Sequence, residues 1–312
     1  MNCLILGGAG FLGTHLTNEL LKKRQNFVTV FGRAESNYSN IHVSYDNIRI
    51  VTGNFTSSFD FLQLTKGQDV VFHLISTTVP STSNVALIDE IEENIIPSIQ
   101  LLKACVTNHV KKIVFMSSGG TVYGIKKESP LLEDDETTPI CSYGIQKLVI
   151  EKYIQLFYHI YGLDYRIIRL ANPYGSFQNP KGKVGAVTTF LWRIMHNQEI
   201  EIYGDGSIVR DYIYVEDAIK GVLKIVDQES EYKIFNLGSG KGYNLCEILA
   251  TAEQVANKKA MIKYLPVRSV DVPYNVLDIS RYIEVTKDVP QTSLVEGMEK
   301  LKKYFLRYDK ND

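Results

Sequence analysis

The chain begins Met1-Asn2-Cys3-Leu4-Ile5-Leu6-Gly7-Gly8-Ala9-Gly10-Phe11-Leu12-Gly13, an apolar strand-like run followed by glycines at 7, 10 and 13 and a helical pattern through Leu21. The first glycine allows a tight turn, the second lets the backbone approach a pyrophosphate closely, and the third lets the helix pack closely on the strand. The helix N-terminus, with Phe11 and Leu12, offers unpaired N–H groups and a positive dipole end to phosphates. Because the pattern directly follows an N-terminal strand, it predicts a dinucleotide-binding turn.

Composition narrows the class of protein. The 312 residues suffice for one large or two modest domains with an apolar core. A net charge of -1 gives no composition-based case for nucleic acid or an acidic membrane surface as the main partner. The sequence has no apolar run long enough to span a bilayer, and its N-terminus reads as a strand rather than a signal peptide, so we expect a cytoplasmic protein.

The cysteines and histidines predict neither disulfides nor a metal site. The six histidines lack paired spacing, and the cysteines are widely scattered, at Cys3, Cys105, Cys141 and Cys246. Buried, reduced thiols are therefore expected.

Further apolar strands recur at residues 27–31, 47–51, 69–75, 111–116 and 165–170, with helical patterns such as 88–108 between them. Strands separated by helices of this length indicate a parallel sheet covered on both faces. The predicted fold class is α/β, a Rossmann-type doubly wound parallel sheet that binds ligands at the carboxyl ends of its strands. Further cofactor contacts are expected after the third and fourth strands and on the next helix, at Asn54, Phe55, Leu74, Ser76 and Asn94.

The end of the second strand bears on the choice of cofactor. An acidic side chain there hydrogen-bonds the adenosine ribose 2′-hydroxyl, whereas an arginine suits a 2′-phosphate. This chain has Gly32 followed by Arg33, which favours NADP(H) and leaves NAD(H) open. The alternative is that Arg33 is simply solvated at the start of a loop, with Glu35 close by.

A later helix, starting after Pro139, carries Tyr143 and Lys147 four residues apart and therefore on one face. An ammonium beside a phenol stabilises the phenolate, and an oxidised nicotinamide adds positive charge, so the pKa of Tyr143 is expected to fall from about 10 toward the working pH. Tyr143 is then a proton donor or acceptor for a sugar hydroxyl or ketone. Alone, such a pair is also typical of a helix surface.

Taken together, these segments resemble the extended short-chain dehydrogenase/reductases of the nucleotide-sugar epimerase/dehydratase family, most closely the UDP-glucose 4-epimerase-like branch. The resemblance covers nearly the whole chain and rests on Gly7-Gly8-Ala9-Gly10-Phe11-Leu12-Gly13, Ser117-Ser118 through Val122-Tyr123-Gly124, Tyr143-Gly144-Ile145-Gln146-Lys147, Arg169-Leu170-Ala171-Asn172-Pro173-Tyr174-Gly175 and Val209-Arg210-Asp211-Tyr212-Ile213-Tyr214-Val215.

The resemblance implies a role for each matching residue. Tyr143 would be the acid/base, and Lys147 would bridge the nicotinamide ribose and tune Tyr143. Substrate contacts would come from phosphate-binding residues and from side chains that shape the pocket: Asn172, Arg210 and Arg268, then Thr78, Val187 and Tyr203. An ion pair of Arg210 with Asp211 or Asp205 is the structural alternative.

The resemblance also implies two domains and a homodimer. Residues 1–171, with 211–240 returning, would form the NAD(P)-binding Rossmann domain, and residues 172–210 and 241–312 a smaller α/β domain for a dTDP- or UDP-linked hexose. The helices 94–108 and 143–161 would form the dimer interface, although their apolar stripes suit a core equally.

One position departs from the family pattern. The family has a serine or threonine four residues before the Tyr-Gly pair, where it helps to hydrogen-bond the reacting sugar oxygen. Here that position is Gly119, which has no hydroxyl. Ser117 or Ser118 is therefore predicted to take over this role.

Two reactions use the same residues. A 4-epimerase removes hydride from sugar C4 and returns it to the other face with one retained NAD+, whereas a 4-ketosugar reductase consumes NADPH. Gly32-Arg33 favours reduction of a nucleotide-linked 4-keto-6-deoxyhexose, with UDP-glucose or UDP-N-acetylglucosamine 4-epimerisation as the alternative. A dehydratase is disfavoured because its Asp-Glu pair is replaced by Gly120-Thr121. A silent NADP-binding sensor is a further hypothesis, against which Tyr143 and Lys147 argue.

Overall fold

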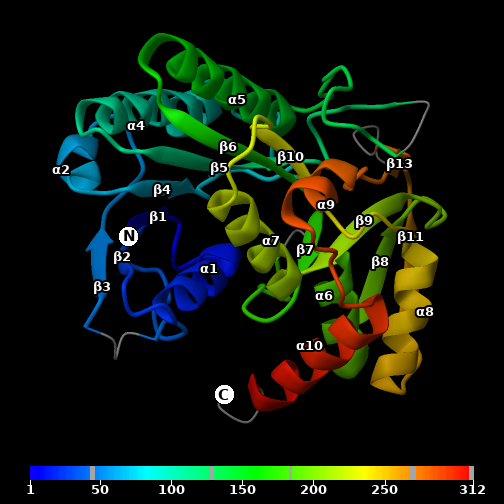
Figure 1. Ribbon diagram of the computed structural model, residues 1–312. Coiled ribbons are helices and arrows are strands. Elements are labelled where there is room, and N and C mark those ends of the chain that lie inside the picture. The colour runs from blue at the N-terminus through cyan, green and yellow to red at the C-terminus, as the bar shows by residue number, and fades with distance from the viewer. Residues whose placement is uncertain (43–45, 127–129, 183–184, 268–271, 309–312) are drawn as a thin grey trace.

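The computed structural model describes residues 1–42, 46–126, 130–182, 185–267 and 272–308 (Figure 1). Its central element is a seven-stranded, wholly parallel sheet in the order β10-β6-β5-β4-β1-β2-β3. The strands are β1 (Asn2–Leu6), β2 (Phe27–Gly32), β3 (Ile48–Thr52), β4 (Val70–His73), β5 (Lys112–Ser118), β6 (Asp164–Leu170) and β10 (Ile234–Leu237). This order confirms the predicted Rossmann-type α/β fold.

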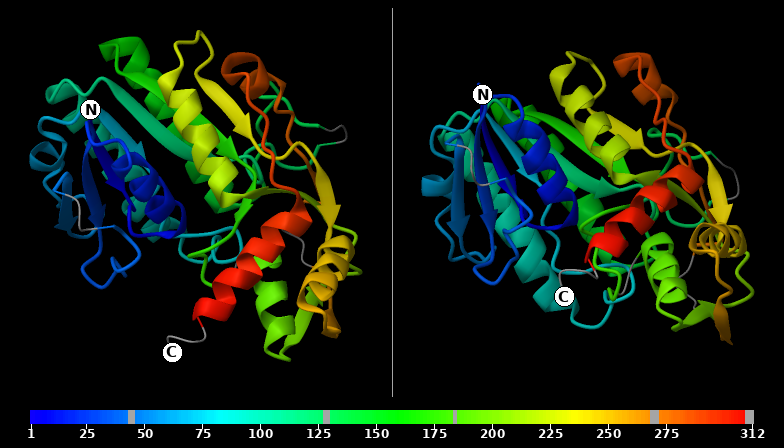
Figure 2. Two further views of the ribbon diagram at one scale, coloured as in Figure 1. Left: turned by 60° about the horizontal axis from the view of Figure 1, so that its bottom comes forward. Right: turned by 90° about the horizontal axis from the view of Figure 1, so that it is seen from below.

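Helices cover both faces of this sheet (Figures 1 and 2). On one face α1 (Phe11–Leu21) contacts α7 (Val215–Asp227), and on the other α4 (Ile96–Thr107) contacts α2 (Phe61–Thr65) and α5 (Ser142–Tyr161). Alternate side chains of β1 enter the two layers, with Ile5 in the cluster of α1 and α7 and Leu4 in that of α4 and α5. Because both faces are buried, the strand is apolar from Cys3 to Leu6 instead of alternating.

The segment predicted as one helix over 88–108 consists of three pieces. They are α3 (Leu87–Glu90), a π-helical turn (Ile91–Ile95) and α4. Pro97, at the start of α4, has no N–H to donate and its ring crowds the preceding turn. A widened π turn just before a proline relieves that conflict and places Asn94 where the helix is irregular.

The remaining elements form a second lobe at the lower right of Figure 1. A four-stranded sheet joins β7 (Asn172–Tyr174), β9 (Val209–Tyr214), β11 (Gly242–Asn244) and β13 (Tyr274–Asn275), and a parallel pair joins β8 (Glu199–Tyr203) and β12 (Met261–Leu265). Three helices pack in this lobe, α6 (Ala186–Met195), α8 (Leu245–Ala256) and α10 (Leu294–Tyr308), while α9 (Ser280–Thr286) contacts α7 and β10.

The chain leaves the large sheet after β6 and returns to it only with α7 and β10. The strand β9, which we expected in the returning segment from residue 211, instead pairs with β7 and β11 in the second lobe. In the sequence, much of the second lobe is therefore inserted between β6 and β10, two neighbouring strands of the large sheet.

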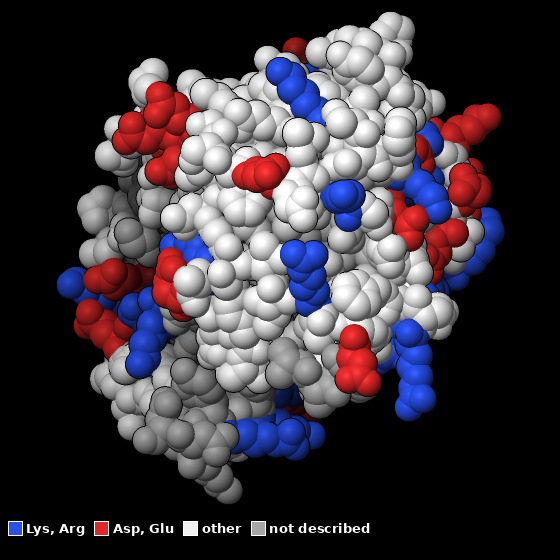
Figure 3. Space-filling model, turned by 90° about the vertical axis from the view of Figure 1, so that its left-hand side faces the viewer, with Lys and Arg blue, Asp and Glu red and all other residues white. Residues whose placement is uncertain are grey.

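The surface and the cysteines add two observations. Acidic and basic side chains are interspersed on the face in Figure 3, in keeping with a net charge of -1. Cys3, Cys105 and Cys141 are buried as expected, whereas Cys246 is exposed. Within the described ranges, the helices are all too short or too polar to cross a membrane.

Candidate active site

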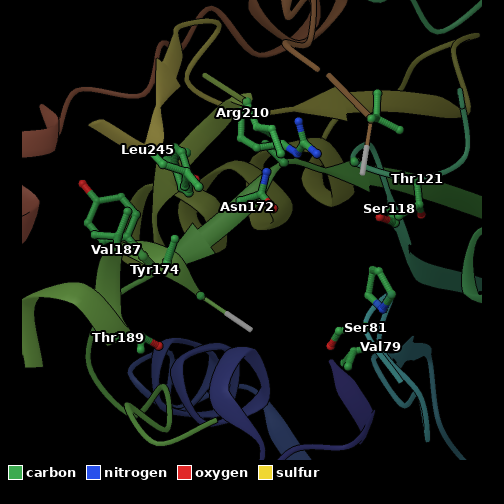
Figure 4. Close-up of a pocket in the computed structure, with 18 of the residues that line it drawn as sticks. Val79, Ser81, Ser118, Thr121, Asn172, Tyr174, Val187, Thr189, Arg210 and Leu245 are labelled. Atoms are coloured by element: carbon green, nitrogen blue, oxygen red, sulfur yellow. The ribbon is translucent and has the colours of Figure 1, made fainter. Parts of the chain in front are cut away.

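A cavity of about 480 Å³ lies beyond the carboxyl ends of the large sheet's central strands, between that sheet and the second lobe (Figure 4). Its sheet side is formed by the loop Val79–Ser81 after β4 and by Ser118 and Thr121 at the end of β5. Its lobe side is formed by residues from β7, α6, β8 and β9. This edge is where parallel α/β sheets bind ligands.

The glycine turn between β1 and α1 has the geometry that a dinucleotide needs. Gly7 has a φ of +84°, and a Cβ on Gly13 would lie 2.0 Å from the Gly7 carbonyl oxygen, so neither position tolerates a larger residue. The first turn of α1 has no acidic residue, and its N-cap, Gly10, has no side chain to satisfy the N–H groups. Those groups, which include Phe11 and Leu12, fit a diphosphate.

The end of β2 carries the predicted phosphate reader. A Cβ on Gly32 would lie 2.9 Å from the Tyr38 hydroxyl, so an acidic residue there requires Tyr38 to move. Arg33 is 69% exposed and its Nε lies 3.2 Å from a carboxylate oxygen of Glu35. An ion pair as exposed as this one contributes little binding energy. The Arg33 guanidinium can therefore release Glu35 and bind a phosphate instead. Its role stays a prediction.

The other predicted cofactor residues differ in what they can offer. Asn54 is exposed after β3, Leu74 is half-buried after β4, and Ser76 is exposed but donates to the Thr78 carbonyl at 3.0 Å. Phe55 is buried and its ring packs against Phe61, with centroids 5.4 Å apart. Only the backbone of Phe55 is therefore available to a ligand.

Asn94 is engaged inside the protein. Its Oδ1 accepts from the Thr77 N–H at 2.9 Å, and its Nδ2 donates to Thr77 Oγ1 and to the Glu90 carbonyl at 2.7 and 3.0 Å. Both amide hydrogens are thus used, which leaves no donor for the cofactor contact we predicted. Thr78, a predicted substrate residue, does not border the cavity, although Val79 next to it does.

Tyr143 and Ser118 meet at the cavity. Tyr143 lies in the first turn of α5, and the Ser118 side chain hydrogen-bonds its phenol. Lys147 is buried one turn further on; its Nζ donates to the Met116 carbonyl at 2.9 Å and lies 5.7 Å from the centroid of the Tyr143 ring. The cation is therefore near the phenol ring.

Burial decides the charge states of this pair. It raises the pKa of Tyr143 to about 12, partly offset by Ser118, and lowers the pKa of Lys147 to about 8, opposed by Glu151. The predicted fall of the Tyr143 pKa is thus wrong for the protein alone, because desolvation of the phenolate outweighs a cation 5.7 Å from the ring. The phenol is protonated at neutral pH.

Ser117, the second predicted hydroxyl, does not reach the cavity. Successive strand residues point to opposite faces of the sheet. The buried Ser117 hydroxyl donates to the Glu151 carboxylate, which Arg169 Nη2 also binds at 2.8 Å. Of the two serines we predicted, only Ser118 is at the site.

A side chain at Gly119 would require Leu277 to shift, and Thr121 was missed. A Cβ on Gly119 would lie 2.6 Å from Leu277 Cδ1 and 3.0 Å from the Arg169 carbonyl oxygen. Thr121 borders the cavity, and its Oγ1 has no hydrogen-bond partner within the described part of the chain. The sequence feature that could have indicated Thr121 is a further hydroxyl-bearing residue in the loop that follows β5.

Four predicted substrate residues border the cavity from the lobe: Asn172, Val187, Tyr203 and Arg210. The Asn172 amide donates to the Asp211 carbonyl at 2.9 Å, and Arg210 Nη1 donates to the Val209 carbonyl at 2.8 Å. The carboxylate of Asp211 accepts from the N–H groups of Ser239 and Gly240. Arg268 lies outside the described residues. Glu201 and Thr189 also line the cavity.

The chain is similar to known nucleotide-sugar enzymes in both sequence and structure. The model of the NAD dependent epimerase/dehydratase family matches residues 3–238. A dTDP-4-dehydro-6-deoxyglucose reductase of Escherichia coli is 31% identical, covering 96% of this chain and 95% of its own. The UDP-glucose 4-epimerase of Thermotoga maritima, solved with UDP-glucose, superposes with a TM-score of 0.92 at 30% identity over 99% of both chains. That of Thermus thermophilus, solved with NAD, gives 0.88 at 26% identity over 98% and 99%.

Proposed function

Because the chain belongs to the NAD dependent epimerase/dehydratase family and is a short-chain dehydrogenase/reductase-type enzyme, we propose that it acts at C4 of a nucleotide-linked hexose. We propose further that it is an NADPH-dependent reductase of a dTDP- or UDP-linked 4-keto-6-deoxyhexose. The observation that carries action at C4 is the Tyr143 phenol, which lies at the cavity wall, is hydrogen-bonded by Ser118 and, with its pKa raised to about 12 by burial, is protonated at neutral pH. A protonated phenol is the form that a carbonyl reduction requires.

The proton is handled by residues of this chain. A bound nicotinamide dinucleotide supplies the hydride for C4. Tyr143 gives its proton to the C4 oxygen, and the phenolate that remains is stabilised by the Lys147 cation and by the Ser118 hydroxyl. Thr121 supplies a second hydroxyl to the same oxygen, in the role that Gly119 cannot fill. Solvent then reprotonates Tyr143.

The lobe side of the cavity binds the nucleotide in this proposal. Arg210 holds diphosphate oxygens through its guanidinium, with Asn172 beside it, and Arg268 is proposed as the second phosphate ligand. Val187 and Tyr203 shape the space for the base and ribose.

The reductase is favoured over the epimerase by the end of β2. With Gly32 there and Arg33 next, the strand end presents a cation and no carboxylate on residue 32, which suits a 2′-phosphate. The alternative, a UDP-hexose 4-epimerase that retains NAD, is favoured by the likeness to the two solved 4-epimerases. The same Tyr143, Ser118 and Lys147 serve both reactions, because epimerisation is an oxidation followed by a reduction.

We also propose a homodimer formed through α4 and α5. The outer face of α5 exposes Leu156, Ile160 and Tyr161, at 44%, 55% and 57% of their surface. An apolar stripe of this kind marks an interface. Light scattering coupled to gel filtration distinguishes the dimer from a monomer.

The cofactor is tested first. The purified protein is denatured to identify any co-purified dinucleotide, and the cofactor-free protein is titrated with NADPH and with NADH. A preference for NADPH of about tenfold or more supports the reductase, since that ratio equals about 1.4 kcal/mol. Retained NAD+, or a preference for NADH, rejects it in favour of the epimerase.

The substrate class is tested next. The protein is incubated with dTDP- and UDP-linked 4-keto-6-deoxyhexoses plus NADPH, and with UDP-glucose plus NAD+. Stoichiometric loss of NADPH with formation of the C4 alcohol is expected. Conversion of UDP-glucose to its C4 epimer without net cofactor change identifies the alternative, and turnover of neither class rejects both.

A further inference from the structure

The helix that carries Tyr143 does not cap its own N-terminus. The residue before α5 is Cys141, which makes no side-chain cap, and the first turn of α5 contains no acidic residue. The first N–H groups of a helix have no intrahelical partners and need acceptors from elsewhere. The first residue of α5, Ser142, directly precedes Tyr143.

Two residues some fifty positions earlier in the chain bind the start of α5, one through a helix N–H group and one through side chains. Asn84 Oδ1 accepts from the Ser142 N–H at 2.7 Å. Glu90 Oε2 accepts from Ser142 Oγ and from Gln146 Nε2, each at 2.5 Å. Glu90 is only 3% exposed and lies against the positive end of the α5 dipole, where a carboxylate is favoured.

The conformation of Asn84 fits this task. Its φ is +77°, a left-handed backbone conformation that asparagine adopts more readily than most residues. The turn directs its amide oxygen away from its own segment and onto α5. The cap thus joins two elements that the sequence places far apart.

The same segment forms part of the cavity wall. Val79, Pro80 and Ser81 border the cavity. Before them, Thr77 is held by two hydrogen bonds to the Asn94 amide. The loop is therefore fixed at one end to the π turn and at the other to the first turn of α5, so that the cavity wall and Tyr143 share one support.

We propose that Asn84 and Glu90 are positioning residues that hold the first turn of α5 so that the Tyr143 phenol is aimed at the reacting sugar oxygen. This inference rests on the proposed function. Without the Asn84 acceptor, the Ser142 N–H is unpaired and the turn can shift. A displacement of about 1 Å at a catalytic group costs on the order of a hundredfold in rate.

The test compares matched cap removals. Asn84→Ala removes the acceptor, and Asn84→Asp restores it. The control is Ser293→Ala, which removes the Ser293 Oγ that accepts from the Glu296 N–H at 3.3 Å at the start of α10, a helix with no cavity-lining residue. Both alanine variants lose a helix cap, but only one cap lies at Tyr143. Glu90→Gln keeps the side-chain size and removes the charge.

Steady-state kinetics with the substrate identified above gives the first readout. Asn84→Ala is expected to lower kcat by about tenfold to a hundredfold with KM changed less than about twofold, and Glu90→Gln to act in the same direction. Asn84→Asp is expected to recover most of the loss and Ser293→Ala to keep the wild-type kcat. Wild-type kcat in Asn84→Ala, or an equal loss in Ser293→Ala, overturns the inference.

A second readout does not need turnover. In protein labelled with 13Cζ-tyrosine, the Tyr143 signal is assigned by its absence in Tyr143→Phe. Its chemical shift is expected to move in Asn84→Ala and to stay in Ser293→Ala. If the wild type turns over no nucleotide sugar, the proposed function fails, and this signal still decides the positioning role: an unmoved signal overturns it.

Discussion

Replacing Lys147 by methionine is expected to stabilise the protein at neutral pH while it removes activity. Lys147 is 4% exposed, and burial lowers its pKa from 10.5 to about 8. A shift of this size equals about 3 kcal/mol of folding free energy lost while the unfolded lysine is charged. Methionine keeps most of the stem but loses the hydrogen bond to the Met116 carbonyl, which is worth about 1 kcal/mol. The net gain for Lys147→Met at pH 7 is therefore about 2 kcal/mol.

The pH dependence has a definite sign. Between about pH 8 and 10.5 the unfolded lysine binds a proton that the folded one does not, so wild-type stability rises with pH across this window. Below pH 8 both states are protonated and the full cost is present. The advantage of Lys147→Met should thus shrink above pH 8 and reverse by about pH 10.5, where only the lost hydrogen bond remains.

Urea unfolding of the cofactor-free proteins at pH 7, 8, 9 and 10 measures this difference. Subtracting the wild-type curve from that of the variant cancels the groups that titrate identically in both. A variant that is less stable at pH 7, by an amount that does not change with pH, would show that Lys147 carries no desolvation cost. Turnover of Lys147→Met is measured alongside and should be lost, because the Tyr143 phenolate then loses the Lys147 cation near its ring.

Four further substitutions test the roles assigned to residues in and near the site. Tyr143→Phe should abolish turnover while leaving dinucleotide affinity unchanged in a fluorescence titration, since it removes one proton donor and little volume; retained turnover rejects the acid/base role. Arg33→Ala should weaken NADPH binding about tenfold more than NADH binding, and equal losses mean that Arg33 does not read the 2′-phosphate. Thr121→Val should lower kcat by about a hundredfold or more, the effect of removing one donor to a developing oxyanion. The matched Ser117→Ala should keep kcat but cost about 1–3 kcal/mol in urea unfolding, because Glu151 loses a buried hydrogen bond; the opposite pattern would return the catalytic hydroxyl to Ser117.

The large sheet was predictable because its signals are local. The run Cys3–Leu6 is apolar at every position, as a strand covered on both faces must be, and the glycines that follow it have steric reasons visible in the sequence. The helix predicted over 88–108 was less accurate. There Pro97 perturbs the helix from within, and apolar periodicity does not register a π turn.

The sequence identified which residues form the site better than it identified their contacts and charge states. Tyr143, Lys147 and Ser118 come together as their motifs indicate, but the choice between Ser117 and Ser118 depends on which face each presents at the end of β5. The charge state of Tyr143 depends on desolvation by atoms from several segments, which spacing along one helix cannot reveal. The contact of Asn84 could not be predicted for the same reason, because its partner Ser142 is distant in sequence.

The late return of β10 to the large sheet has a consequence for synthesis of the chain on the ribosome. The strand β6 ends at Leu170, and β10, which covers its outer edge, ends at Leu237. At about 5–20 residues per second, roughly 3 to 13 s pass between the emergence of these two ends. During that interval β6 presents an open edge of unpaired backbone N–H and C=O groups that can pair with another nascent chain. A slower passage through codons 171–237 would lengthen this exposure, so the yield of folded protein is tied to translation speed in a segment that belongs mostly to the other lobe.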